Sequence, residues 1–198
     1  MIGQIGPLVQ GGIARWRVLG AHLLGGATGG MLAGLVLGWL GILVAAIAPL
    51  TSFFGFGRSF VLPAICVYAG LSDLGLRSLP KPGHQRQTPH HWLCAFGPVP
   101  ASFAWGFDLA TGVSTKLPFL AVMVIPTYAL LSNNWAAAVL MMGLYGLSRA
   151  AMVDIAVLEG GEDFQSQCGL IAAHSNPLKI AAGCLALLAA TAGIAGVI

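Results

Sequence analysis

Residues 95–131 read AFGPVPASFAWGFDLATGVSTKLPFLAVMVIPTYALL, an apolar stretch long enough to cross a membrane. It nevertheless contains two charged residues, Asp108 and Lys116, and the prolines Pro118 and Pro126. A charged side chain at the centre of a bilayer costs roughly 3 kcal/mol on insertion scales, so such residues usually face a cavity, a partner or a pathway. The stretch therefore predicts a site inside a membrane protein.

The composition of the whole chain indicates the same class. Hydrophobic residues make up 57% of the 198 positions and charged residues 8%, with a mean hydropathy of +0.86. A soluble globular chain has about 25% charged residues. The net charge of +3 comes from only nine Lys and Arg against six Asp and Glu, too few and too scattered for a nucleic-acid surface. The chain is expected to have the lipid bilayer, and no nucleic acid, as a partner.

Apolar runs predict an all-α, polytopic bundle that forms a single membrane domain over residues 1–198. A helix needs about 20 apolar residues to cross the hydrocarbon. The expected helices are about 19–47, 58–76, 98–131, 135–157 and 179–198. The third is too long for one straight crossing, so it is expected to be broken near 112–118. If it formed a hairpin instead, there would be six crossings rather than five.

The distribution of basic residues favours five crossings with the N-terminus in the cytoplasm. Seven basic residues would then lie in inner loops and one, Arg58, in an outer loop, as the positive-inside rule requires. The inner residues are Arg15, Arg17, Arg77, Lys81, Arg86, Arg149 and Lys179. The apolar run that begins at Val18 is too long for the core of a signal peptide, so it is expected to be a retained first helix.

The break itself is the expected site of ion or solute passage. Gly112 and Pro118 weaken a helix, and unwinding there would expose carbonyls at the end of one half-helix and N–H groups at the start of the other. Such termini are ready sites for cations and anions respectively. The polar residues expected to form the pathway are Asp108, Ser114, Thr115, Lys116, Arg149 and Asp154. An Asp108–Arg149 pair is geometrically reasonable, and it would either fix helix packing or serve the pathway.

Glycine forms a second pattern, with 28 residues in the chain. In the first helix, small residues recur at spacings that place them on one face. They are Gly25, Gly26, Gly29, Gly30, Gly34, Gly38 and Gly41. Such a face permits close backbone approach in lipid. Internal packing, with Gly143, Gly146 and Ser148 as the complementary surface, is favoured over a seam between two copies.

The four cysteines, Cys66, Cys94, Cys168 and Cys184, form no CxxC and match no standard zinc spacing. Cysteine is also a common buried small hydrophobe, so ordinary packing is favoured. His90, His91 and Cys94 lie close together and are a weak candidate metal site, since thiolate and imidazole suit zinc or copper. His22 is expected to be a hydrogen-bonded residue rather than a ligand. The residues point to no cofactor.

Several short motifs resemble small bacterial membrane proteins related to the CcdA/DsbD transmembrane domain of cytochrome c biogenesis. They are Gly25–Gly41, Arg86–Trp92, Phe96–Pro98, Trp105–Thr115 and Tyr145–Ala150. The resemblance implies a bundle of broken, proline-containing helices in the bacterial inner membrane. In its thiol-active members it also implies cysteines that pass reducing equivalents, with a thioredoxin-like partner. This chain departs from that pattern, because the broken helix has Ser114 and Thr115 but no cysteine.

Three functional hypotheses follow. The first is a transporter-like protein that moves an ion or small solute through the break. The second is a transmembrane thiol or electron-transfer protein that uses the four cysteines. The third is a non-catalytic subunit that packs with other membrane subunits. No nucleophile–base pair, phosphate loop or glycosidase-like carboxylate pair is present, which argues against an enzyme of those types.

Overall fold

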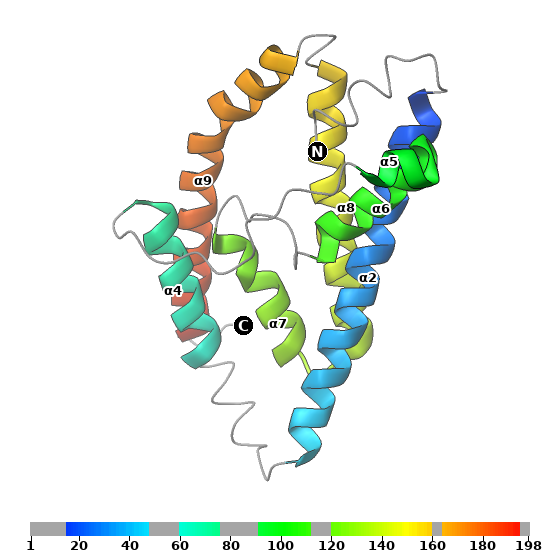
Figure 1. Cartoon of the computed structure of the whole chain (residues 1–198). Coiled ribbons are helices and arrows are strands. Elements are labelled where there is room, and N and C mark those ends of the chain that lie inside the picture. The colour runs from blue at the N-terminus through cyan, green and yellow to red at the C-terminus, as the bar shows by residue number, and fades with distance from the viewer. Residues whose placement is uncertain (1–14, 48–59, 76–90, 112–119, 160–163, 195–198) are drawn as a thin grey trace. The chain divides into compact units, whose positions relative to one another are not determined.

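The computed structural model describes residues 15–47, 60–75, 91–111, 120–159 and 164–194 (Figure 1). The regular elements in these ranges are all helices, so the all-α prediction is confirmed. They are α2 (Arg15–Ile47), α4 (Leu62–Asp73), α5 (His91–Phe96), α6 (Pro98–Thr111), the short 3-10 helix η2 (Leu120–Met123), α7 (Val124–Leu131), α8 (Trp135–Glu159) and α9 (Phe164–Ile194).

Two of these helices, rather than the five expected, are long and apolar enough to cross a membrane. By length and composition they are Arg15–Ala46 within α2 and Trp135–Glu159, which is α8. Shorter apolar helices cover 62–73, 120–131 and 176–191 of the part of the chain that the structure describes. The shorter helices follow from local sequence: Pro63 lies in the first turn of α4, and Gly75, just after its end, has a φ of 78°.

Two segments between the expected helices are partly helical, which corrects the boundaries predicted from the sequence. Helix α5 lies between the helices expected over 58–76 and 98–131, and it ends at Phe96, just before Gly97, whose φ is 79°. Helix α9 begins at Phe164 rather than near residue 179, and it includes Pro177. Asn176–Pro177, a dipeptide typical of a turn, therefore lies inside the helix. Proline removes one backbone hydrogen bond, but a helix that is otherwise continuous can run through it with a local adjustment.

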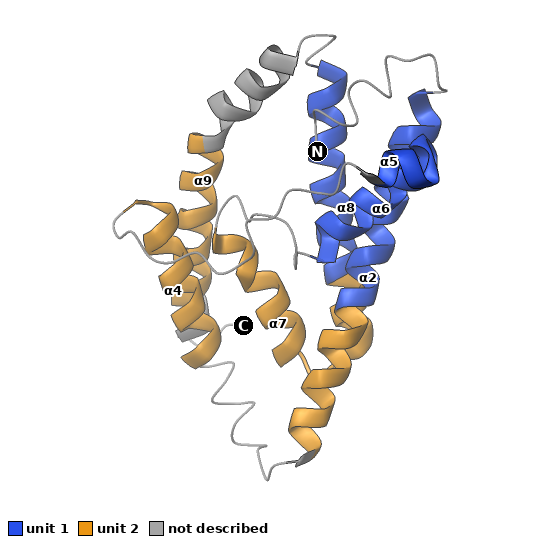
Figure 2. Ribbon diagram, in the orientation of Figure 1, with its two compact units in different colours: residues 1–33, 83–116, 142–174 blue, residues 34–82, 117–141, 175–198 orange. Residues whose placement is uncertain are grey.

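The chain divides into two compact units, which Figure 2 shows in different colours. Unit 1 comprises residues 1–33, 83–116 and 142–174, and unit 2 comprises residues 34–82, 117–141 and 175–198. Residues 95–131 are divided between the two units: α6 belongs to unit 1, whereas η2 and α7 belong to unit 2. The expected break at 112–118 lies outside the described residues.

Each unit has its own apolar core. In unit 1 the buried cluster consists of Val18, Leu19, Ala101, Trp105 and Val157, from α2, α6 and α8. In unit 2 it consists of Leu62, Cys66, Leu131 and Ala190, from α4, α7 and α9. Both clusters therefore join segments that are far apart in the sequence, as expected for helices that pack in a bundle.

The glycine face of α2 packs internally, as the sequence predicts. In unit 1 a Cβ added at Gly26 would lie 2.7 Å from Ala150 Cβ and 2.8 Å from the Gly146 carbonyl oxygen. In unit 2 a Cβ at Gly38 would lie 2.7 Å from Trp135 Cα. These distances are too short for any residue but glycine without movement of α8. Ser148, in contrast, is exposed, so its predicted place in the complementary surface is wrong.

Candidate functional site

A histidine–aspartate pair lies buried in unit 1. His22 Nδ1 of α2 is 2.9 Å from Asp154 Oδ1 of α8. His22 has no exposed surface, and Asp154 is 4% exposed. The glycine contacts explain the meeting of these two residues: Gly26 lies one turn after His22, and its neighbour Ala150 lies one turn before Asp154. Close approach of antiparallel helix segments thus brings the two polar side chains together one turn away.

Four buried polar atoms around this core have no hydrogen-bond partner among the described residues. They are His22 Nε2, Asp154 Oδ2, Ser102 Oγ and Trp105 Nε1. Ser102 and Trp105 lie on the buried face of α6, and both side chains have no exposed surface. The same face approaches α2 closely, because a Cβ at Gly106 would meet the carbonyl oxygen of His22. Three helices of unit 1 thus contribute polar atoms to one core.

Such atoms are costly in a structural core. A buried polar group without a partner costs about 1 to 3 kcal/mol in proteins. A buried carboxylate costs more unless a positive charge or several hydrogen bonds compensate for it. Asp154 has one described partner, and that partner is a histidine, whose charge depends on protonation. The pair is therefore a buried ionisable group whose charge is only partly compensated among the described residues.

The C-terminal end of α6 is met by an arginine of the same unit. Arg149 Nη1 donates to the carbonyl oxygen of Leu109 at 2.9 Å and to Tyr145 Oη at 3.0 Å. The guanidinium also lies over the Tyr145 ring, 5.6 Å from its centre. A cation is favourable at a helix C-terminus, where carbonyl groups lack partners in the helix. The cation site expected at the end of this half-helix is thus occupied, at Leu109, by Arg149.

Asp108 lies next to Leu109, partly buried in the last turn of α6, and its carbonyl oxygen accepts a hydrogen bond from Thr111 Oγ1. The predicted Asp108–Arg149 pair stays a prediction. Ser114, Thr115 and Lys116 lie outside the described residues.

The start of η2 is met by an aspartate of unit 2. Asp73 Oδ1 accepts from the Leu120 N–H at 2.9 Å, and Asp73 Oδ2 accepts from the Ala121 N–H at 2.8 Å. Asp73 is 2% exposed. A carboxylate is the group that a helix N-terminus prefers, because its first N–H groups have no partner in the helix. The first N–H groups of η2 are therefore bound by the chain itself, whereas the break expected near 112–118 lies outside the described residues.

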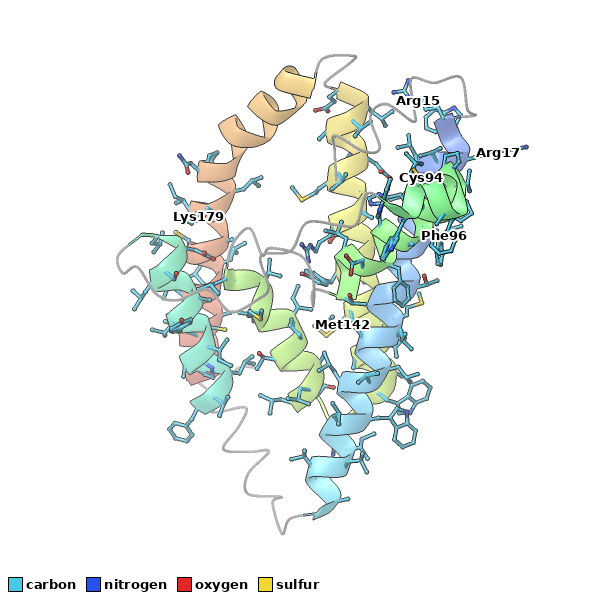
Figure 3. The ribbon with its side chains drawn as sticks, in the orientation of Figure 1. Arg15, Arg17, Cys94, Phe96, Met142 and Lys179 are labelled. Carbon is cyan, nitrogen blue, oxygen red and sulfur yellow. The ribbon has the colours of Figure 1, made fainter. Side chains whose placement is uncertain are left out.

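The metal and thiol predictions rest on residues that the structure describes only in part. His90 lies outside the described residues, and Cys94 is exposed on α5, where Figure 3 labels it with Phe96. In the described part of the chain, no three His, Cys, Asp or Glu residues are grouped so that they could hold a metal ion. Cys66 is buried and Cys184 exposed, and all three of these cysteines are free thiols. Cys168 lies within α9.

The prediction that His22 is hydrogen-bonded is confirmed, although its partner Asp154 was not foreseen. That Asp154 and Arg149 are pathway residues stays a prediction, and Ser102, Trp105 and Asp73 were not predicted as buried polar residues. Asp73 had a usable signal, since it is an acidic residue within an apolar run. Nothing in the sequence connects His22 with a residue 132 positions away.

Comparison with known proteins gives one point of similarity. No family model matches the chain, and no solved structure matches it. The chain is 28% identical over 149 residues to the methylamine utilization protein MauF of Paracoccus versutus. The aligned region covers 75% of this chain and 53% of MauF, so the chain spans about half the length of this curated relative.

Proposed function

We propose that the chain is a transporter-like integral membrane protein that moves an ion or small solute through the core of unit 1. The observation that carries the proposal is the buried His22–Asp154 pair, in which each side chain has one partnered atom and one orphaned atom. Ionisable residues inside membrane segments are rare and commonly mark ion pathways or proton relays. In this proposal Asp154 and His22 bind the cargo or the coupling ion.

The side chains exposed on the two long helices support the placement in a membrane. Large apolar residues there include Leu24, Val36 and Trp39 of α2 and Leu140 and Leu144 of α8, each more than half exposed. A helix in lipid presents such residues outward because the hydrocarbon replaces the protein core. We further propose a multi-pass arrangement in the bacterial inner membrane with a cytoplasmic N-terminus, because the basic residues follow the positive-inside pattern.

In this proposal the ends of the helices within residues 95–131 are held in place by charged side chains of other helices. Arg149 at the end of α6 and Asp73 at the start of η2 each satisfy helix-terminal groups of their own unit. Charged residues used in this way hold the backbone in place where a membrane helix does not continue. Asp108, Ser114, Thr115 and Lys116 remain proposed as the approach to the pathway, and Asp154 is its centre.

The name of the relative suggests the first cargo to test. A protein of methylamine utilization serves the use of methylamine, which is protonated to methylammonium at neutral pH. We therefore propose methylammonium as the first small cation to offer, beside Na⁺, K⁺ and H⁺. A carboxylate such as Asp154 attracts all of them, so the flux measurement decides between them.

The test is flux into vesicles that contain the purified chain. An imposed membrane potential drives uptake of each cation, and uptake is compared between the wild type and Asp154→Asn. Glu159→Gln is the matched control, because it makes the same acid-to-amide change at an exposed position of the same helix. We expect Asp154→Asn to lower uptake at least tenfold and Glu159→Gln to leave it unchanged.

Circular dichroism and size-exclusion chromatography establish that each variant is folded. Equal uptake by Asp154→Asn would refute the role of the pair. If the folded wild type moved none of the four cations, the proposal would fail and the non-catalytic subunit hypothesis would gain support.

A further inference from the structure

We infer that the charge bound in the core of unit 1 is a proton, taken up by His22 Nε2 while His22 Nδ1–H remains hydrogen-bonded to Asp154. This inference rests on the proposed function and names its ion. It is carried by the packing around the pair, by the charge balance of the pair and by the kind of polar atoms beside it.

The packing leaves room for a proton rather than a larger solute. A Cβ at Gly106 would meet the His22 carbonyl oxygen and lie 2.9 Å from the Gly26 backbone nitrogen. A Cβ at Gly26 would lie 2.7 Å from the Ala150 side chain. The helices that supply the site are therefore in backbone contact on two sides of His22. A proton needs no space between these backbones, whereas a larger cation needs the helices to separate.

The charge balance of the pair requires one positive charge. With a neutral imidazole, Nδ1–H donates to the carboxylate and Nε2 holds a lone pair, so the buried pair carries one net negative charge. Uptake of a proton forms a single N–H bond at Nε2 and gives an imidazolium beside a carboxylate, with no net charge. Release breaks the same bond and returns the lone pair to Nε2. No oxidant, reductant or second reactant enters this step.

The neighbouring orphaned atoms suit a proton better than a metal cation. Trp105 Nε1–H is a donor only, and it repels a cation that seeks oxygen ligands. Ser102 Oγ is a hydroxyl that can both donate and accept, and it is buried in the same unit without a partner among the described residues. Asp154 Oδ2 accepts only, and it stabilises the protonated state by its charge. The core of unit 1 thus contains a donor (Trp105), an acceptor (Asp154) and a group that can do both (Ser102).

In the described part of the chain, His22 contacts one charged group of the packed helices. Asp154 is the titratable group that contacts His22 among the residues that the structure describes. The remaining groups on the described parts of α2, α5, α6 and α8 are Arg15, Arg17, Cys94, Asp108, Tyr145, Arg149 and Glu159. Of these, Arg149 and Tyr145 bind each other, and Arg149 also binds the end of α6. Asp154 is therefore the charged group in direct contact with His22 among the described residues.

The experiment measures proton entry directly. Vesicles that contain the purified chain and an internal pH-sensitive dye are given an inside-negative potential with K⁺ and valinomycin. We expect the wild type to acidify the interior, and His22→Gln and Asp154→Asn each to lower the rate at least tenfold. Glu159→Gln should keep the wild-type rate. Proton entry that is unchanged in His22→Gln would overturn the inference.

A second measurement on the wild type guards against variants that fail to fold. Nitrogen-15 NMR of histidine-labelled protein in vesicles should show one imidazole whose Nδ1 stays protonated while Nε2 gains a proton as the pH falls, and this signal should be absent from His22→Gln. A His22 ring that keeps one protonation state across the pH range of flux would overturn the inference.

The flux results separate the two proposals. If Asp154-dependent uptake is found for Na⁺, K⁺ or methylammonium but not for H⁺, the proposed function stands and the proton inference falls. If no cation enters, both fall.

Discussion

Each of the two units buries an aspartate, and the two aspartates differ in how many of their oxygens are hydrogen-bonded. In unit 2 both oxygens of Asp73 accept backbone N–H groups at the start of η2. In unit 1 one oxygen of Asp154 meets His22, and the other has no partner among the described residues. Their exposed fractions, 2% and 4%, are nearly the same, so burial alone does not distinguish them. The difference lies in how completely each carboxylate is satisfied.

Under the proposed function, this difference separates a structural charge from a functional one. A carboxylate whose two oxygens each accept from a fixed backbone N–H group contributes to stability and is held in one place. A carboxylate with a titratable partner and a free oxygen can change state without any change of fold, which is what a transport site requires. The comparison therefore predicts that the same kind of substitution has opposite consequences in the two units.

The largest expected effect on stability is at Asp73. Asp73→Ala leaves two N–H groups without an acceptor, and at about 1 to 3 kcal/mol for each the loss should be roughly 2 to 6 kcal/mol. Asp154→Asn should change stability by less than about 1 kcal/mol, because the neutral amide still accepts from His22 and leaves no uncompensated charge. Thermal unfolding in detergent, followed by circular dichroism, measures both.

The proposed difference between the two aspartates would be refuted if the order of the two stability losses were reversed. A stability loss for Asp154→Asn that exceeds the loss for Asp73→Ala would make the His22–Asp154 pair a structural tie. Asp73→Asn is a useful intermediate, since its amide retains one acceptor and should lose about half as much as Asp73→Ala.

A smaller effect is expected at the close approach that brings His22 and Asp154 together. Gly26→Ala places a methyl group 2.7 Å from Ala150 Cβ and 2.8 Å from the Gly146 oxygen, so α8 must move. Overpacking of this kind costs about 1 to 3 kcal/mol. Gly20→Ala on the same helix meets nothing within 4 Å and should be neutral or slightly stabilising. Thermal unfolding compares the two variants, and vesicle uptake should fall only for Gly26→Ala.

If both glycine variants behaved alike, the contact between α2 and α8 in unit 1 would not control the pair. Loss of uptake in Gly26→Ala without loss of stability would sharpen the comparison, because it would show that the separation of His22 and Asp154 matters more than the packing energy.

Local patterns in the sequence predicted the helical class, α2 and α8, and the internal use of the glycine face. These features depend on hydropathy and on spacing along one helix, and both are visible in a single segment. The sequence did not reveal the His22–Asp154 pair or the Asp73 cap, because each joins segments that are distant in the chain. It also misplaced the start of α9, since Pro177 favours a turn locally but is accommodated within a longer helix.

The smallest effect is expected from the cysteines, and it tests the alternative that the family resemblance implies. A variant with Cys66→Ala, Cys94→Ser, Cys168→Ser and Cys184→Ser removes every thiol. We expect unchanged proton uptake and a stability change below about 1 kcal/mol, because Cys66 fills an apolar core and Cys94 and Cys184 are exposed. Loss of uptake, or a redox-dependent thiol pair trapped in the wild type, would instead indicate thiol transfer with a thioredoxin-like partner. In that case the buried charge of unit 1 would serve a redox reaction, and the contrast between Asp73 and Asp154 would no longer identify a transport site.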